Sequence, residues 1–369
     1  MCAKETKMEI SRDELTEKLR KLGESFSNVL YEEDETFLEN MKTKNLAGDD
    51  INKYRFWEWT QGVGLFGFWK LFKQTGEKEY LDKLIAYYDR QMEVGFPAKN
   101  VNTVTPLLGM CLVGEYCDRK DYLAVCDEWA KWIYESFPRT KEGGFQHVTS
   151  DTLNDSEIWD DTLYMTVLFL ALYGKMTGNR DYIDEASYQF LLHIKYLTDK
   201  ETGLWFHGWS FNEKSNFARA LWGRGNCWIT MGIPEFLDIV EVPLPIKRFL
   251  TESFKAQCEA LKKYQDESGM WHTLVDDPTS YVESSATCGF AYGILKGVHM
   301  GLLSKEYEET ALKALKPILG YINDEGVVEQ VSYGTPMGRI TKDFYKEIPL
   351  KPMPYGQALA ILFLMEALK

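Results

Sequence analysis

An acidic pair, Asp160 and Asp161, lies between a tryptophan and an apolar run from Leu163 to Leu172. Carboxyl groups act as general acids or bases when apolar neighbours such as Trp159 raise their pKa toward neutrality. Asp is also favoured at the N-terminal cap of a helix, so the local sequence leaves a capping role for Asp161 open. Asp161 is therefore a candidate acid or base whose pKa we expect to be raised by desolvation.

Further polar and aromatic residues gather in connections between helical stretches, about once per helical hairpin. These connections combine Trp, Gly, His, Asn and Asp, the mixture that a sugar pocket requires for hydroxyl groups and pyranose faces. Core packing explains most aromatic residues, which form 14% of the chain, but not this concentration in loops. The connections are Trp57–Val63, Asn100–Thr103, Gly143–His147, Trp159–Thr162, Gly203–Trp209, Trp222–Trp228, Tyr281–Ser284 and Tyr355–Gln357.

Two of these connections carry side chains that suit an anionic ligand. His207 lies among Trp205, Phe206 and Trp209, so a hydrogen-bonded core histidine is an equally good interpretation of it. Arg224 stands between two glycines, which packing explains poorly, because a helix former would serve better in a structural turn. The cluster as a whole favours a binding site.

No other catalytic pattern competes with this cluster. The sequence contains no Walker A motif, no dinucleotide-binding fingerprint, no His-Glu-x-x-His and no Gly-x-Ser-x-Gly. Its five histidines are dispersed, and its seven cysteines show no regular spacing. We therefore expect neither a metal site nor a disulfide framework.

The chain is acidic, with 56 Asp and Glu against 42 Lys and Arg and a net charge of −14. Such a body repels nucleic acid and anionic membranes, and no Lys or Arg run forms a basic stripe. A short anionic sugar is still acceptable, because one or two buried arginines can bind it. The N-terminal residues contain no apolar signal segment, and no apolar run reaches the length of a membrane span. We expect a soluble protein of the reducing cytoplasm.

The elements that would position the connections are helices, because apolar residues recur at helical spacing and strand-like alternation is rare. A weak repeat relates residues 73–83 to residues 175–185, each consisting of a helix end, a Thr-Gly turn and a new helix start. It predicts hairpins of about 50 to 60 residues, of which about six fit in the chain. The residues that carry these patterns are Leu15, Leu19, Leu22, Phe26 and Val29 after a capping-box spacing at Ser11–Glu14, and the tyrosines Tyr80, Tyr122, Tyr182 and Tyr307.

The segment Ala358–Leu368 is apolar on nearly all sides, which is typical of a buried helix. An open solenoid would instead end in a polar capping repeat. We therefore predict that the last hairpin packs against the first. This gives an all-α (α/α)6 barrel of six helical hairpins, in a single catalytic domain that spans residues 1–369. In such a ring alternate loops gather at one mouth.

The ordered set of motifs resembles glycoside hydrolase family 105, the unsaturated rhamnogalacturonyl hydrolases, from about residue 55 to the C-terminus. The resemblance implies an (α/α)6 barrel that needs no metal and no organic cofactor. It also implies that Asp161 is the catalytic acid/base and that His147, His207, Arg224 and Trp228 bind substrate. The matching pieces are Trp57-x-Trp-x-Gln-Gly-Val63, Gly143-Gly-Phe-x-His147, Trp159-x-Asp-Thr-Leu-x-Met165, Gly203-Leu-x-x-His-Gly-Trp209, Arg224-Gly-Asn-x-Trp228 and Tyr355-Gly-Gln357.

The reaction that the resemblance implies is hydration of the C4=C5 double bond in a terminal unsaturated uronic acid. A proton added at C4 gives an oxocarbenium-like cation at C5, water adds there, and the resulting hemiketal opens and expels the remaining sugar. One carboxyl group, that of Asp161, can first give a proton and then accept one from water. A polysaccharide lyase would supply such a substrate.

The same resemblance suggests how the sugar is held. Arg224 can bind the uronate carboxylate bidentately, or His207 can donate to it. Trp57 and Trp228 are candidate stacking platforms, and Trp159 borders the acid. Some relatives carry Asp where Asn102 stands here, and an amide can bind a sugar hydroxyl but cannot act as a base.

The sequence thus predicts a glycosidase of carbohydrate metabolism that removes a 4,5-unsaturated uronic acid from small anionic oligosaccharides, such as those of pectin degradation. Three alternatives stay open: a glucuronyl hydrolase of glycosaminoglycan disaccharides, a non-catalytic sugar-binding barrel, and an epimerase with two facing histidines. The leaving sugar, its linkage and the oligomeric state are not determined by the sequence.

Overall fold

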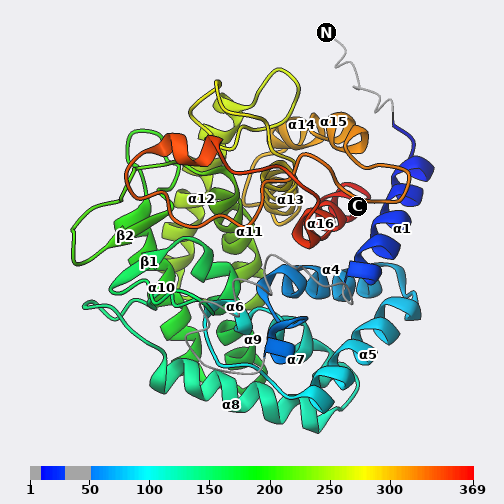
Figure 1. The fold of residues 1–369 in the computed structure, drawn as a ribbon, viewed down its shortest axis with the longest axis vertical. Helices are drawn as coiled ribbons and strands as arrows, with labels where there is room; N and C mark the ends of the chain where they lie inside the picture. The colour runs from blue at the N-terminus through cyan, green and yellow to red at the C-terminus, as the bar shows by residue number, and fades with distance from the viewer. Residues whose placement is uncertain (1–9, 30–50) are drawn as a thin grey trace.

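Six helices form a closed ring at the centre of the molecule (Figure 1). The computed structural model describes residues 10–29 and 51–369, and Cys2 and the other N-terminal residues lie outside this part. Each ring helix packs on the next, and the last closes on the first. The ring helices are α4 (Trp59–Thr75), α7 (Leu107–Tyr116), α9 (Leu168–Thr177), α11 (Gly223–Ile239), α13 (Ser284–His299) and α16 (Pro354–Ala367).

A second layer of helices surrounds the ring, and each member packs on a neighbouring inner helix. Inner and outer helices alternate along the chain, which is the (α/α)6 barrel predicted from the sequence. The outer helices are α1 (Arg12–Val29), α5 (Lys78–Val94), α8 (Lys120–Ser136), α10 (Arg180–Leu197), α12 (Leu244–Tyr264) and the pair α14 (Glu306–Leu312) and α15 (Leu315–Gly320).

The two layers differ in sequence for a physical reason. Helix α16 is buried from Tyr355 to Glu366, because it has neighbours on all sides, as the apolar C-terminal segment predicted. Helix α5 instead buries one face, which includes Tyr80, Leu84 and Tyr88 at helical spacing. Outer helices are therefore buried on one side, whereas inner helices are buried on all sides.

The repeat seen in the sequence corresponds to the turns between the layers. Gly76 and Gly178 end α4 and α9 with φ of 74° and 70°, a left-handed conformation that glycine adopts without strain. The four recurring tyrosines lie in the first turns of the outer helices α5, α8, α10 and α14. The helical hairpin is therefore the repeating unit.

Strand structure is slight in the described residues, as expected. Strands β1 (Glu157–Trp159) and β2 (Gly208–Ser210) pair antiparallel at one end of the ring. Short elements complete the chain: α3 (Ile51–Tyr54), α6 (Val101–Val104), the π-helix η1 (Leu163–Val167) and the 3-10 helix η2 (Lys342–Lys346). Among the described helices, none is both long and apolar enough to cross a membrane.

A buried charge cluster joins three inner helices. The carboxylate of Glu235 on α11 lies 2.8 Å from Nζ of Lys70 on α4 and 3.4 Å from Nζ of Lys296 on α13. The hydroxyl of Tyr292 also donates to Glu235. Burial acts to raise the pKa of Glu235, but the two ammonium groups outweigh it and hold that pKa at about 2.

Glu235→Ala is expected to lower the free energy of unfolding by about 3 to 5 kcal/mol, because it removes the carboxylate that pairs with two largely buried ammonium groups and leaves Lys296 only its pair with Asp238. The folded pKa of Glu235, about 2, lies below its ordinary 4.5. Its stabilising contribution is therefore complete above pH 4.5 and is lost as the pH falls toward 2. Urea unfolding of both proteins across this range measures it.

The matched control is Glu252→Ala, which removes an exposed ion pair with Lys255 on α12. This variant should lose at most about 1 kcal/mol. Equal losses in the two variants, or a Glu235→Ala difference that is unchanged by acid, would contradict the role of the buried cluster.

Candidate active site

A cavity of about 1050 Å³ lies where the inner helices begin. Residues from the first turns of α4, α6 and α16 line it, as do residues that precede or open α9 and α11. Helix N-termini carry partial positive charge, so their convergence favours an anionic ligand in a protein that is acidic overall. Six of the eight connections singled out in the sequence contribute residues to this cavity, whereas Gly203–Trp209, which includes His207, and Tyr281–Ser284 do not line it.

Residues 331–353, here called the cover segment, form one wall of this cavity. In Figure 1 these residues, coloured orange-red, run across one face of the ring before the chain enters α16. The segment contributes Tyr333, Arg339 and Lys351, among others, to the cavity wall. It therefore encloses the ligand site opposite the inner helices.

The small sheet places the acidic pair beside His207. Strand β1 leads directly into Asp160, and β2 begins directly after His207. The backbone N–H of Asp160 donates to the carbonyl of His207 at 3.0 Å, and Nε2 of His207 lies 3.4 Å from Oδ2 of Asp161. The π-helix η1 follows Asp161 almost immediately, and π-turns of this kind are frequent at functional sites.

The two carboxyl groups of the pair have different surroundings. Asp161 lines the cavity, whereas Asp160 is fully buried behind it against Gly225, where a Cβ would lie 2.4 Å from Oδ2 of Asp160. Any side chain at Gly225 would collide with Asp160, which explains why a glycine follows Arg224. The side chains do not point apart as successive residues often do, because one oxygen from each lies within 4.8 Å of the other and of His207.

Asp161 differs from expectation in its ionisation. Burial acts to raise its pKa, as predicted, but hydrogen bonding and proximity to His207, with His147 and Asp160 adding to the effect, outweigh burial and lower the pKa below its ordinary value. Burial and the neighbouring Asp161 charge raise the pKa of Asp160 well above its ordinary value. The pair therefore holds one proton, on Asp160, and Asp161 faces the cavity as a carboxylate.

His207 is held from both sides. Its Nδ1 lies 2.6 Å from the hydroxyl of Tyr345 in the cover segment, and that hydroxyl accepts the Gly338 N–H at 3.0 Å. In the tautomer that carries the ring proton on Nε2, Nδ1 accepts from the tyrosine hydroxyl and the proton faces Asp161. Burial lowers the pKa of His207, so the ring beside the carboxylate is neutral.

His147 and Trp159 line the cavity, as predicted. Their rings stack with centroids 4.3 Å apart, and Nδ1 of His147 lies 2.8 Å from the hydroxyl of Thr162. Burial lowers the pKa of His147 to about 3, so this histidine offers hydrogen bonds and not charge. Trp159 also contacts His207 edge-on at 5.0 Å and so lies between the two histidines. They do not form the facing pair that an epimerase would need.

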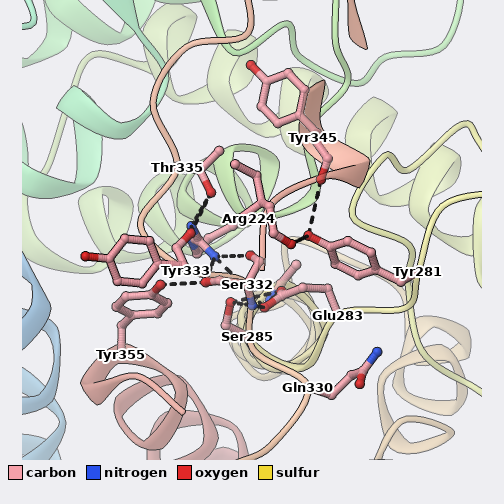
Figure 2. Close-up of polar contacts among 12 residues, drawn as sticks. Arg224, Tyr281, Glu283, Ser285, Gln330, Ser332, Tyr333, Thr335, Tyr345 and Tyr355 are labelled. Carbon is pink, nitrogen blue, oxygen red and sulfur yellow. Dashed lines mark hydrogen bonds and ion pairs between the residues drawn. The ribbon is translucent and has the colours of Figure 1, made fainter. Parts of the chain in front are cut away.

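The structure gives Arg224 a different role from the predicted bidentate grip on a carboxylate. Figure 2 shows its guanidinium group directed at the start of the cover segment. One amino group donates to the Ser332 carbonyl at 2.9 Å and to the Ser332 hydroxyl, and the other to the Tyr333 carbonyl at 3.1 Å and to the Thr335 hydroxyl at 2.9 Å. Arg224 is only 1% exposed and fastens the cover segment, although it also borders the cavity.

Glu283 completes this attachment. Its carboxylate accepts the Ser332 N–H at 2.9 Å and lies 3.9 Å from the Arg224 guanidinium (Figure 2). It also accepts the Ala286 N–H at 2.6 Å and so caps α13. The same buried pair therefore fixes a ring helix and the cover segment together.

The predicted stacking platforms Trp57 and Trp228 are fully buried and do not line the cavity. Trp57 donates from Nε1 to the Thr103 carbonyl at 2.9 Å and so supports α6. Trp228 packs edge-on against Trp59, which does line the cavity and stacks on Tyr355 with centroids 4.6 Å apart. The structure offers the partly exposed ring of Trp59 in their place, and the buried rings of Tyr355 and Trp222 also border the cavity.

Two carboxyl groups of the cavity wall, Glu58 and Asp151, were not predicted from the sequence. Glu58 stands between Trp57 and Trp59 in a motif that was noticed only for its aromatic residues. Asn102 also lines the cavity, as predicted, and its side chain hydrogen-bonds to Glu58. The position of Glu58 between two tryptophans, in a loop already expected to line the site, was the signal in the sequence that could have identified it.

Asp160, Asp161 and His207 form the one group of metal-type ligands identified among the described residues. The set fits a metal poorly, because Asp161 is the one member that lines the cavity, while Asp160 and His207 are buried behind it. Exhaustive treatment with a chelator is therefore expected to leave turnover unchanged, relative to enzyme dialysed without it. A large loss of turnover that added zinc or calcium restores would contradict this expectation.

Comparison with known proteins places this chain in a family. The family model "Glycosyl Hydrolase Family 88" matches residues 32–369. Unsaturated rhamnogalacturonyl hydrolase YesR of Bacillus subtilis is 32% identical over 316 residues, which cover 85% of this chain and 90% of YesR.

Two solved structures of possible family 105 members are also similar. The protein from Klebsiella pneumoniae is 42% identical with a TM-score of 0.91, covering 99% of this chain and 95% of the other. The protein from Salmonella enterica is 44% identical with a TM-score of 0.90, covering 99% and 96%. The chain therefore belongs to the glycosyl hydrolases that the family model describes, and the predicted membership of family 105 is confirmed. It is a glycosidase.

Proposed function

We propose that this enzyme removes a 4,5-unsaturated uronic acid from the non-reducing end of short oligosaccharides, preferably the rhamnogalacturonan type on which YesR acts by its name. The observation that carries the proposal is the Asp161 carboxylate, which faces the cavity and lies beside a neutral His207. An ordinary glycosidase flanks the anomeric carbon with two carboxyl groups, whereas hydration of an alkene needs a base for water at C5. An ionised Asp161 suits that base.

The cavity suits a small anionic sugar. Its volume, about 1050 Å³, is at the upper end for small-molecule sites and accommodates more than one sugar ring. Trp59 is partly exposed and provides a ring face, which the buried Tyr355 supports by stacking on it, and the helix N-termini favour negative charge. We assign the uronate carboxylate to Lys351, whose ammonium group lies 4.1 Å from the Tyr333 ring centre in the cavity wall.

The cellular setting follows from the same chemistry. A lyase must first cut a polyuronate such as pectin by β-elimination, because only that reaction leaves the C4=C5 double bond. The six described cysteines are all unpaired, which supports a reducing compartment, and we propose the cytoplasm.

The test is a panel of lyase-generated disaccharides, with loss of the alkene absorbance as the readout. We expect the rhamnose-linked unsaturated galacturonide to be consumed faster than sulfated unsaturated disaccharides. A reversed order would favour the glucuronyl hydrolase alternative. Binding without any loss of absorbance would favour a sugar-binding barrel.

A further inference from the structure

Glu58 is a second carboxyl group in the wall of the cavity. It stands at the N-cap of α4 but makes no capping hydrogen bond into that helix, and its residue is 5% exposed. The hydroxyl of Ser150 donates to its Oε1, and the side chain of Asn102 forms a further hydrogen bond. Ser150 in turn accepts from Nδ2 of Asn100 at 3.0 Å. Glu58, Asn102 and Ser150 all line the cavity, and we call them the acid corner.

The electrostatics of the acid corner favour a bound proton. Burial raises the pKa of Glu58 to about 7, against the opposing effect of the Ser150 hydrogen bond, and the charge of Asp151 adds to the rise. Asp151 itself lines this cavity, and the other charged side chains that line it are Asp161, Arg55, Arg224, Arg339 and Lys351. Near neutral pH, Glu58 is therefore an acid while Asp161 is a base.

We propose that Glu58 is the residue that protonates C4 of the unsaturated uronic acid, while Asp161 takes a proton from the water that adds at C5. This assignment rests on the hydration reaction proposed above and divides its two proton transfers between two residues. It also gives Asn102 a role, because its side chain hydrogen-bonds to Glu58 and so helps to position the acid.

The step balances without any other reactant. The O–H bond of Glu58 breaks, and the alkene electron pair forms the C4–H bond. Water oxygen bonds to C5 as one of its protons passes to Asp161. The C5 hemiketal then opens to a ketone, and the ring oxygen remains on C1 as a hydroxyl group. The C1 bond to the leaving sugar breaks to give an aldehyde and a free sugar, and the proton on Asp161 returns to Glu58 through solvent.

Glu58→Gln is expected to lower kcat by about 10² to 10⁴ with little change in KM, because the amide keeps the shape but has no acidic proton. Wild-type kcat should fall as the pH rises through about 7, the pKa of Glu58, since the protonated form is the active one. That alkaline decline should be absent from the residual activity of Glu58→Gln.

Two further variants separate chemistry from packing. Glu58→Gln combined with Asn102→Asp returns a carboxyl group to the acid corner and should recover at least about tenfold in kcat. Asp151→Asn removes a charge that raises the pKa of Glu58, so the alkaline decline should begin at lower pH. This shift is measured on a protein with Glu58 intact, so it decides the question even if Glu58→Gln does not fold.

The outcomes distinguish this inference from the proposed function. A wild-type enzyme that consumes no unsaturated disaccharide overturns both. An active wild type, with a folded Glu58→Gln variant that keeps kcat within threefold and retains the alkaline decline, overturns only the assignment of Glu58. An alkaline decline that Asp151→Asn does not move has the same consequence.

Discussion

Asp161→Asn is expected to remove nearly all turnover, lowering kcat by about 10² to 10⁴, because the amide cannot take a proton from water. Asn has the same shape as Asp, so the fold and the binding of the disaccharide should persist. The measurement is kcat for the unsaturated disaccharide, with circular dichroism and a binding titration on the same protein.

Asp160→Asn is the matched control. Asp160 is fully buried and carries a proton, so an isosteric neutral amide should cost much less turnover than the change at Asp161. The assignment would be overturned by the reverse order, with Asp160→Asn inactive and Asp161→Asn active while both variants fold and bind the disaccharide.

Arg224→Lys is expected to loosen the cover segment, although the charge is unchanged. A lysine ammonium group cannot reproduce the planar fork that binds Ser332, Tyr333 and Thr335. Each lost charge-assisted hydrogen bond costs about 1.5 to 3 kcal/mol before relaxation, so we expect lower kcat/KM, lower stability and faster proteolysis within residues 331–353.

Two control variants identify the origin of that effect. Arg180→Lys alters an exposed arginine on α10 that pairs with Asp184, and it should leave all three measurements nearly unchanged. Lys351→Met should raise KM for the anionic sugar without lowering stability. If Arg224→Lys behaves like Lys351→Met, with an intact cover segment, Arg224 contacts the substrate carboxylate after all.

The ring was predictable from sequence because its signals are local and repeated. A Thr-Gly turn before each of two outer helices and the all-round apolar character of α16 are visible without coordinates. The site residues Asp161, His147, Trp159 and Asn102 were found because they occur in loops rich in aromatic residues and glycine, and these loops meet at one end of the ring.

The parts that could not be predicted depend on direction and on distant partners. Trp57 and Trp59 are two residues apart, and only the helix start at Trp59 decides which ring faces the cavity. Arg224 finds its partners in Ser332 and Thr335, more than a hundred positions along the chain. The pKa of Asp161 depends on His207, which joins it only through the pairing of β1 with β2.

The closure of the ring by α16 has a consequence for synthesis. Helix α16 packs on α4, α13 and α1, and Arg12 donates to the Leu368 carbonyl at 2.5 Å. The ribosome makes α4 early and α16 late, so the nascent chain holds an open arc whose apolar edges lack their final neighbour. Helix α16 also brings Tyr355 to the cavity. The cavity wall is therefore complete only after α16 has emerged from the ribosome and packed against the ring.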